Sequence, residues 1–180
     1  MAAEPRSDRS DRDIPADPRT TASGGDDTDD QDTIRERVTR LAFGGDPDQF
    51  AEFVRAVDES TPAGVEVILR GSAVTGHKWH SEEPFDADGP GTSDLDLTLV
   101  GAEVVGLFNL TGFFVPGVHS RPLSDEDPLI APDLIPLRQE LIEMVGRPVN
   151  IQASRELVIQ FRGDLLGQPY LTLIEGRSDT

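Results

Sequence analysis

Two acidic residues separated by one leucine, Asp94 and Asp96, open an apolar run that reads LDLTLVG from Leu95 to Gly101. Side chains alternate between the two faces of a β-strand, so both carboxylates are expected on one face and the leucines on the other. Two carboxylates held side by side repel each other unless a cation lies between them, and carboxylate oxygens suit Mg²⁺. The acid pair therefore predicts a magnesium site with Asp94 and Asp96 as metal ligands.

A Gly-Ser pair, Gly71 and Ser72, follows an earlier apolar run that ends at Arg70. Ligands favour the carboxyl edge of strands in sheets flanked by helices. Glycine lets the backbone approach a phosphate closely, and serine offers a hydroxyl and an N–H at the start of a short helical turn. A phosphate-binding turn beside a magnesium site indicates nucleoside triphosphate (NTP) chemistry. Arg70 and Lys78 are further candidate phosphate contacts, although a solvated surface cation explains each of them equally well.

The segments RGSAVTG (70–76) and SDLDLTLVG (93–101) together resemble the signature of the DNA polymerase beta-like nucleotidyltransferase superfamily, in particular its minimal nucleotidyltransferase-domain proteins. The signature itself covers residues 71–97, and the wider pattern of helices and strands covers about residues 33–175. The combination is fairly specific, because Gly-Ser must end one strand and the acid pair must open the next.

The resemblance implies a role for each residue of the signature. Gly71 and Ser72 would hold the β- and γ-phosphates of the triphosphate. Asp94 and Asp96 would coordinate Mg²⁺, which positions the α-phosphate and screens its charge during in-line attack.

The family has a third acid on a later strand, and the matching segment PVNIQ (148–152) carries Asn150 at that position. An amide oxygen can bind Mg²⁺, but it adds no negative charge and cannot accept a proton. The resemblance therefore places Asn150 in the catalytic set with Asp94 and Asp96, and it leaves three outcomes open: weak catalysis, another acid in its place, or binding without reaction.

The loop between the Gly-Ser pair and the acid pair, residues 73–93, carries aromatic and histidine side chains. Trp79 could stack on a base, but a lone tryptophan more often packs its loop against the protein, and we favour that interpretation. His77 and His80 are spaced like metal ligands, yet without cysteine or a further nearby histidine they do not complete a zinc motif.

Asp86 and Asp88 in the same loop resemble half of a calcium-binding loop. Pro90 and Leu97 occupy two of the positions where ligands belong, so the calcium interpretation is disfavoured. A flexible loop rich in glycine and proline that closes over a nucleotide is the better interpretation.

The alternation of the remaining segments predicts an α/β (α+β) domain, in which helices pack on a mixed β-sheet. Residues 1–31 are expected to form a disordered acidic tail, and residues 32–176 the nucleotidyltransferase-like domain. Strands are expected at 65–70, 95–101, 113–118, 148–152 and 172–175. Helices are expected from Asp32 to the Gly44-Gly45 pair, after an N-cap at Asp46, over 132–145 with its start near Pro136, and from a cap at Ser154 to about Leu166.

Net charge, cysteine content and hydrophobicity exclude or disfavour several kinds of partner and site. The net charge of −18 disfavours duplex DNA and anionic membranes as partners. The absence of cysteine excludes a disulfide scaffold, a thiolate metal site and a thiol nucleophile. No apolar run approaches the ~20 residues needed to span a bilayer, and the first residues lack the apolar segment of a signal peptide, so we expect a cytoplasmic protein.

Together with these residues, the resemblance implies a magnesium-dependent, ATP- or other NTP-binding nucleotidyltransferase that transfers a nucleoside monophosphate to an acceptor hydroxyl. The acceptor is a protein, an RNA end or a small molecule, and a homodimer or a partner protein could supply its binding surface. The alternative is a catalytically weak or inactive nucleotide-binding or regulatory module of the same fold, as in a toxin–antitoxin pair. In a third interpretation, Asp94 and Asp96 have no chemical role and only cap the strand by accepting backbone hydrogen bonds.

Overall fold

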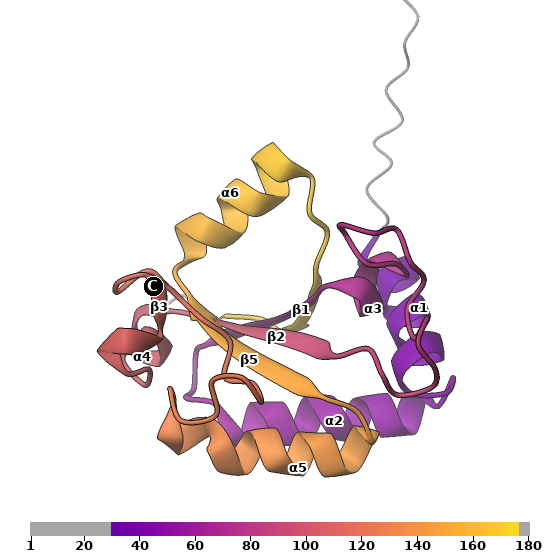
Figure 1. Cartoon of the computed structure of the whole chain (residues 1–180), viewed down its shortest axis with the longest axis horizontal. Helices are drawn as coiled ribbons and strands as arrows, with labels where there is room; N and C mark the ends of the chain where they lie inside the picture. Colours follow the sequence, from indigo (N-terminus) through magenta and orange to yellow (C-terminus); the bar gives the residue numbers. More distant parts are fainter. Residues whose placement is uncertain (1–29, 177–180) are drawn as a thin grey trace, which may run out of the picture.

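The computed structural model describes residues 30–176, which contain one six-stranded mixed β-sheet with helices packed on it (Figure 1). This arrangement confirms the expected α+β fold. The expected tail lies outside the described residues, apart from its last two positions. The strands are β1 (Glu66–Arg70), β2 (Leu95–Val100), β3 (Phe113–Val115), β4 (His119–Ser120), β5 (Val149–Ser154) and β6 (Leu171–Ile174).

Strand β2 lies in the middle of the sheet, whose order is β3-β4-β5-β2-β1-β6. It pairs with β1 in the antiparallel direction and with β5 in the parallel direction. In this register Arg70 lies opposite Asp96, and Asp96 lies opposite Asn150. Three of the candidate site residues therefore form one row across three neighbouring strands.

The helices divide between the two faces of the sheet. In Figure 1, α2 and α5 lie side by side along one face and α6 lies over the opposite face. None of the helices in residues 30–176 combines the length and apolar character required to cross a membrane. The helices are α1 (Gln31–Ala42), α2 (Pro47–Ser60), α3 (Ser72–Thr75), α4 (Ala102–Val105), α5 (Ile135–Val145) and α6 (Glu156–Leu166), with 3-10 turns at Leu110–Gly112 and Pro132–Leu134.

Helix α2 begins as the sequence predicts. The side chain of Asp46 accepts hydrogen bonds from the backbone N–H groups of Asp48 and Gln49, and Pro47 occupies the first helical position. This cap satisfies N–H groups that have no partner within the helix. Phe50 and Phe53 then project into the core from the buried side of the helix.

The two faces of the sheet differ in chemistry. Leu95, Leu97 and Leu99 of β2 are fully buried in the main core with α2 and α5. The opposite face carries polar side chains, including Asp96 and Asn150, and a small apolar cluster of Ile68, Val100 and Ile159 packs α6 against it. Because side chains alternate along each strand, one set of residues builds the core and the next set lines the polar face.

Several local expectations need correction. Strand β5 continues past the expected end to Ser154, which does not cap α6, since that helix begins at Glu156 without a side-chain cap. The expected strand 113–118 ends at Val115, and the chain turns there to form β4. Helix α4 was not expected, because four residues are too few to show a helical period.

Candidate functional site

Asp94, Asp96 and Asn150 converge at one end of the polar sheet face. Asp94 directly precedes β2, and Asp96 is the second residue of that strand. The side-chain amide nitrogen of Asn150 donates to Asp94 Oδ2 at 2.6 Å and to Asp96 Oδ1 at 3.0 Å. One amide group therefore bridges both carboxylates, which lie on the same face as their spacing predicts.

Gly71 closes the site from the side of β1. Its φ of +80° and ψ of −159° belong to a backbone conformation that residues with a Cβ rarely adopt. A Cβ placed on Gly71 would also lie only 2.6 Å from Asp96 Oδ2. Backbone and carboxylate thus touch, so the Gly-Ser turn and the acid pair meet at a single edge of the sheet.

The charge of Asp96 is poorly compensated. Burial and the nearby Asp94 raise the pKa of Asp96 to about 6, while the hydrogen bond from Asn150 and the charge of Arg70 act in the opposite direction. In turn, burial and the charge of Arg162 lower the pKa of Arg70 to about 10, although Asp96 favours its charged form. An added cation beside Asp96 would relieve the unfavourable ionisation of this carboxyl group.

The residues present can hold Mg²⁺ through oxygen. Asp94 and Asp96 offer carboxylate oxygens, and Asn150 would offer its Oδ1 atom after its amide group turns over. Residues 30–176 contain no group of three or more His, Cys, Asp and Glu side chains arranged to hold a metal. A magnesium ion here would therefore depend on two carboxylates and an amide, with water and substrate phosphates completing its shell.

The two candidate phosphate contacts differ in position. Lys78 Nζ pairs with Glu83 at 3.1 Å and with Asp88 at 3.2 Å, so its charge is neutralised within the loop. No hydrogen bond or ion pair in the described part of the chain joins Lys78 to the acid pair. Arg70, in contrast, lies beside Asp96 in the sheet. The structure therefore supports Arg70 rather than Lys78 as a neighbour of the site.

A small pocket of about 90 Å³ opens beside the Gly-Ser turn. Arg70, Gly71 and Trp79 contribute to its lining, together with Gln168, whose Oε1 accepts a hydrogen bond from Arg70 at 3.2 Å. Trp79 is 54% exposed, so the expectation that it packs its loop against the protein was wrong. Its side chain instead forms part of the lining of this pocket.

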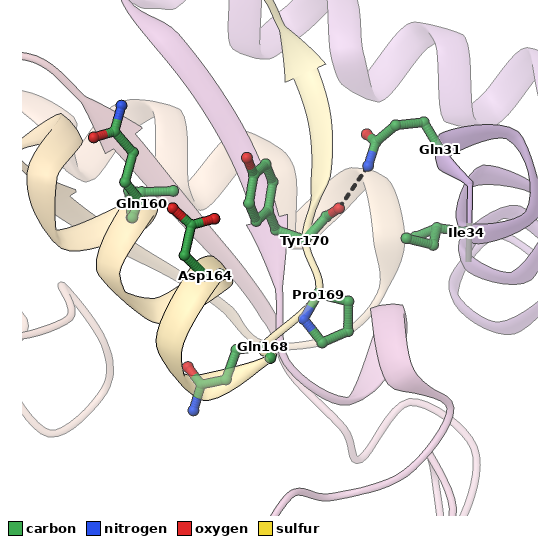
Figure 2. Close-up of a pocket in the computed structure, with 10 residues that line it drawn as sticks. Gln31, Ile34, Gln160, Asp164, Gln168, Pro169 and Tyr170 are labelled. Atoms are coloured by element: carbon green, nitrogen blue, oxygen red, sulfur yellow. Dashed lines mark hydrogen bonds between the residues drawn. The ribbon is translucent and has the colours of Figure 1, made fainter. Parts of the chain in front are cut away.

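A larger pocket of about 400 Å³ adjoins the small one, and both share residues 168–169. Figure 2 shows Gln160 and Asp164 of α6 on one side of the Tyr170 ring. On the other side, Gln31 of α1 donates a hydrogen bond to the backbone oxygen of Tyr170 at 2.9 Å. The pocket thus lies between α6 and α1, away from the acid pair.

An ion pair that the sequence did not reveal anchors the loop before Asp94. Two guanidinium nitrogens of Arg147 donate to the two carboxylate oxygens of Asp86 at 3.0 and 3.1 Å, and one of them also donates to the backbone oxygen of Ser93 at 3.1 Å. Although burial acts to raise the pKa of Asp86, bonds from Arg147 and from backbone N–H groups hold it below its ordinary value. Asp86 therefore has a structural partner, and the ion pair positions the residue that directly precedes Asp94.

No protein-family model, curated protein or solved structure matches this chain. The similarity of the Gly-Ser turn and the acid pair to nucleotidyltransferases remains a prediction made from the residues themselves.

Proposed function

We propose that the protein is a magnesium-dependent nucleotidyltransferase, which moves a nucleoside monophosphate from an NTP to an acceptor hydroxyl. The observation that supports this most strongly is the contact between the Gly-Ser turn and the acid pair. Gly71 has no room for a Cβ beside Asp96, and Asn150 bridges the two carboxylates. A phosphate bound by the backbone of the turn would lie within reach of a cation bound by the acids.

The roles of the residues follow from their positions. Asp94 and Asp96 would hold Mg²⁺, which when bound neutralises charge on the phosphates and orders them for in-line displacement. The turn at Gly71 and Ser72 would hold the β- and γ-phosphates, with Arg70 as an additional donor. The acceptor oxygen would form a bond to the α-phosphorus as the bond to the β-phosphate oxygen breaks, and pyrophosphate would leave.

Asn150 is the reason why we expect slow nucleotidyl transfer. The acceptor hydroxyl must lose a proton during the transfer, and an amide cannot accept it. The proton would therefore pass to solvent without help from a residue at this position, so we expect slow turnover.

The second candidate function is a nucleotide-binding or regulatory module that does not turn over. The bridging amide of Asn150 favours it, because the two carboxylates already have a hydrogen-bond donor where the family has a third acid. Under either function we place the protein in the cytoplasm, with an NTP as ligand and a protein, an RNA end or a small molecule as the second partner. A homodimer or a partner protein would provide the remaining surface.

Release of pyrophosphate tests the proposal. The full chain is incubated with Mg²⁺, each α-labelled NTP in turn and an acceptor of each class, and both pyrophosphate and labelled product are measured. We expect turnover that the double variant Asp94→Asn/Asp96→Asn loses. Asp88→Asn is the matched control, because Asp88 is an exposed loop acid whose partner is Lys78.

The outcomes separate the two functions. Turnover that survives in the double variant would contradict the nucleotidyltransferase assignment. Magnesium-dependent binding of an NTP without turnover would favour the binding module, in particular if Asn150→Asp gains activity.

A further inference from the structure

Two arginines near the polar face of the sheet, Arg70 and Arg162, form no ion pair within residues 30–176, although Arg70 lies beside Asp96 in the sheet. Arg70 ends β1, and Arg162 reaches toward the sheet from α6. Neither one takes part in an ion pair within 4.0 Å in the described part of the chain. Neutral groups hold them instead: Arg70 donates to the side-chain oxygen of Gln168 at 3.2 Å, and Arg162 lies 3.3 Å from His119 Nε2.

His119 serves as the acceptor for Arg162. Its ring is buried, and its Nδ1 atom lies 3.1 Å from Ser154 Oγ. Since Nε2 faces a guanidinium donor, Nδ1 carries the hydrogen and donates it to the serine. Burial, together with the charges of Arg162 and Arg70, lowers the pKa of His119 to about 4, so the imidazole is neutral at neutral pH. His119 thereby orients Arg162 without neutralising its charge.

The two guanidinium groups retain donors for a ligand. Each of them makes a single side-chain hydrogen bond within residues 30–176. Within residues 30–176, the one buried side-chain nitrogen or oxygen atom that lacks a hydrogen-bond partner is Nε of Arg147, which belongs to neither of these two arginines. The side-chain nitrogen atoms of Arg70 and Arg162 that have no hydrogen-bond partner are therefore not completely buried. Gln168 connects the two arginines, because its side-chain oxygen accepts from Arg70 and its backbone N–H donates to the backbone oxygen of Arg162 at 3.1 Å. Arg162 also disfavours the charged form of Arg70, and an anion between them would relieve that repulsion.

We propose that Arg70 and Arg162 form a binding site for a phosphoryl group on the sheet face beneath α6, with His119 and Gln168 as positioning residues. Planar guanidinium groups suit phosphate oxygens because they donate two parallel hydrogen bonds. The ligand class rests on the proposed function, since Arg70 lies next to Asp96 in the sheet. The phosphoryl group belongs either to the NTP or to the acceptor.

Binding of inorganic pyrophosphate in magnesium-free buffer tests the site by calorimetry. We expect wild-type protein to bind it and Arg162→Gln to bind at least tenfold more weakly, because one charged donor group is lost. Arg155→Gln is the matched control, since it removes the same charge from an exposed residue at the start of α6. We expect its affinity to stay within twofold of wild type. Absence of binding by wild type, or equal affinity of both variants, would overturn the proposal.

The positioning role of His119 has its own test. His119→Gln keeps a side-chain acceptor for Arg162, whereas His119→Phe removes it. We expect the glutamine variant to retain most of the pyrophosphate affinity and the phenylalanine variant to lose severalfold more. Equal affinities of these two variants, with both proteins folded by circular dichroism, would contradict the role of the imidazole.

Two further measurements separate this site from the proposed function and identify the source of the phosphoryl group. Asp94→Asn/Asp96→Asn should keep the magnesium-free binding of pyrophosphate even though it loses nucleotidyl transfer, and loss of that binding would overturn an independent site. Pyrophosphate is then added to protein saturated with Mg²⁺ and a non-hydrolysable NTP. Displacement of the NTP by pyrophosphate would show that the site of Arg70 and Arg162 takes phosphates of the nucleotide. Binding alongside the nucleotide, if Arg162→Gln abolishes it, would assign the site to the acceptor.

Discussion

Asn150 determines how the two carboxylates are held together in the metal-free protein. Its amide donates to both Asp94 and Asp96, and hydrogen bonds to charged acceptors contribute about 1.5–3 kcal/mol each. An aspartate at this position would remove both bonds and add a third negative charge. We therefore expect Asn150 to stabilise the metal-free fold, and under the proposed function the same residue would slow the transfer.

The first prediction concerns Asn150→Asp. Without Mg²⁺, we expect the free energy of unfolding to fall by about 2–4 kcal/mol, because donors are replaced by like charge. Saturating Mg²⁺ should recover more stability in this variant than in wild type, since three carboxylates bind the cation more tightly. Urea denaturation with and without Mg²⁺ measures both effects, and Asn150→Ala separates loss of the bonds from added charge. A metal-free Asn150→Asp protein as stable as wild type would contradict this account.

The second prediction concerns pH and Asp96. Its pKa is raised from 3.8 to about 6 in the folded metal-free protein, so between these values the folded state binds more protons than the unfolded state. Stability is therefore lost as pH rises from about 4 to about 6. Asp96→Asn escapes this loss, and we expect it to be more stable than wild type by about 1–3 kcal/mol at pH 7 and nearly equal at pH 4.

The comparison of wild type with Asp96→Asn also removes the effect of His119 on the pH dependence of stability. Its pKa is lowered from 6.5 to about 4, so its contribution to stability is lost as pH falls through this range, in both proteins alike. Denaturant unfolding of wild type and Asp96→Asn at several pH values measures the difference. A stability difference that does not change between pH 4 and pH 7 would argue against a raised pKa for Asp96.

At the scale of elements, the loop between α3 and β2 is held at its end by the pair of Arg147 and Asp86. The Arg147 side chain is 7% exposed, and its guanidinium lies 4.6 Å from the centre of the Phe85 ring. Its bond to the backbone of Ser93 connects this pair directly to the start of the acid pair. The position of Asp94 thus depends on a residue that follows α5, far away in the chain.

The third prediction concerns Arg147→Met. The change leaves the half-buried Asp86 carboxylate with backbone donors alone, and we expect a loss of about 2–4 kcal/mol in stability together with weaker Mg²⁺ binding. Arg121→Met is the matched control, because Arg121 pairs with Asp127 at 2.9 Å nearer the surface, where such pairs contribute about 0–1 kcal/mol. Urea denaturation and calorimetry measure the two quantities. Equal losses in both variants would contradict a specific role for Arg147.

The sequence predicted those elements whose residues show a clear period. Strands β1 and β2 and helices α1, α2 and α5 appear within a few residues of the expected positions, because each buries a regular set of apolar side chains. Helix α4 and strand β4 escaped prediction because they are too short to show a period. Ser154 matched a helix cap locally, but pairing with β4 extends β5 through it.

The candidate site was predictable in part for a related reason. Asp94 and Asp96 share a face because of local alternation, which the sequence contains. The bridge from Asn150 and the contacts of Arg147 and Arg162 arise from segments that come together only in the folded chain. No spacing along the sequence reports such contacts, so these arginines were not recognised as part of the site or its surroundings.

At the scale of the whole molecule, the sheet has one apolar face and one polar face. One face forms the main core with α2 and α5, and α6 lies over the opposite face (Figure 1). That opposite face carries Asp96 and Arg70, and Arg162 belongs to α6 above it. The net charge of −18 repels anions at long range, so we expect a cation to be required for tight nucleotide binding.

The most direct test is a crystal structure of the full chain with Mn²⁺ and a non-hydrolysable NTP, in which anomalous scattering locates the metal. We predict that the metal is bound by Asp94 and Asp96 and that the β- and γ-phosphates contact the backbone at Gly71 and Ser72. Metal or triphosphate bound elsewhere, with the amide of Asn150 still bridging the two carboxylates, would contradict the account.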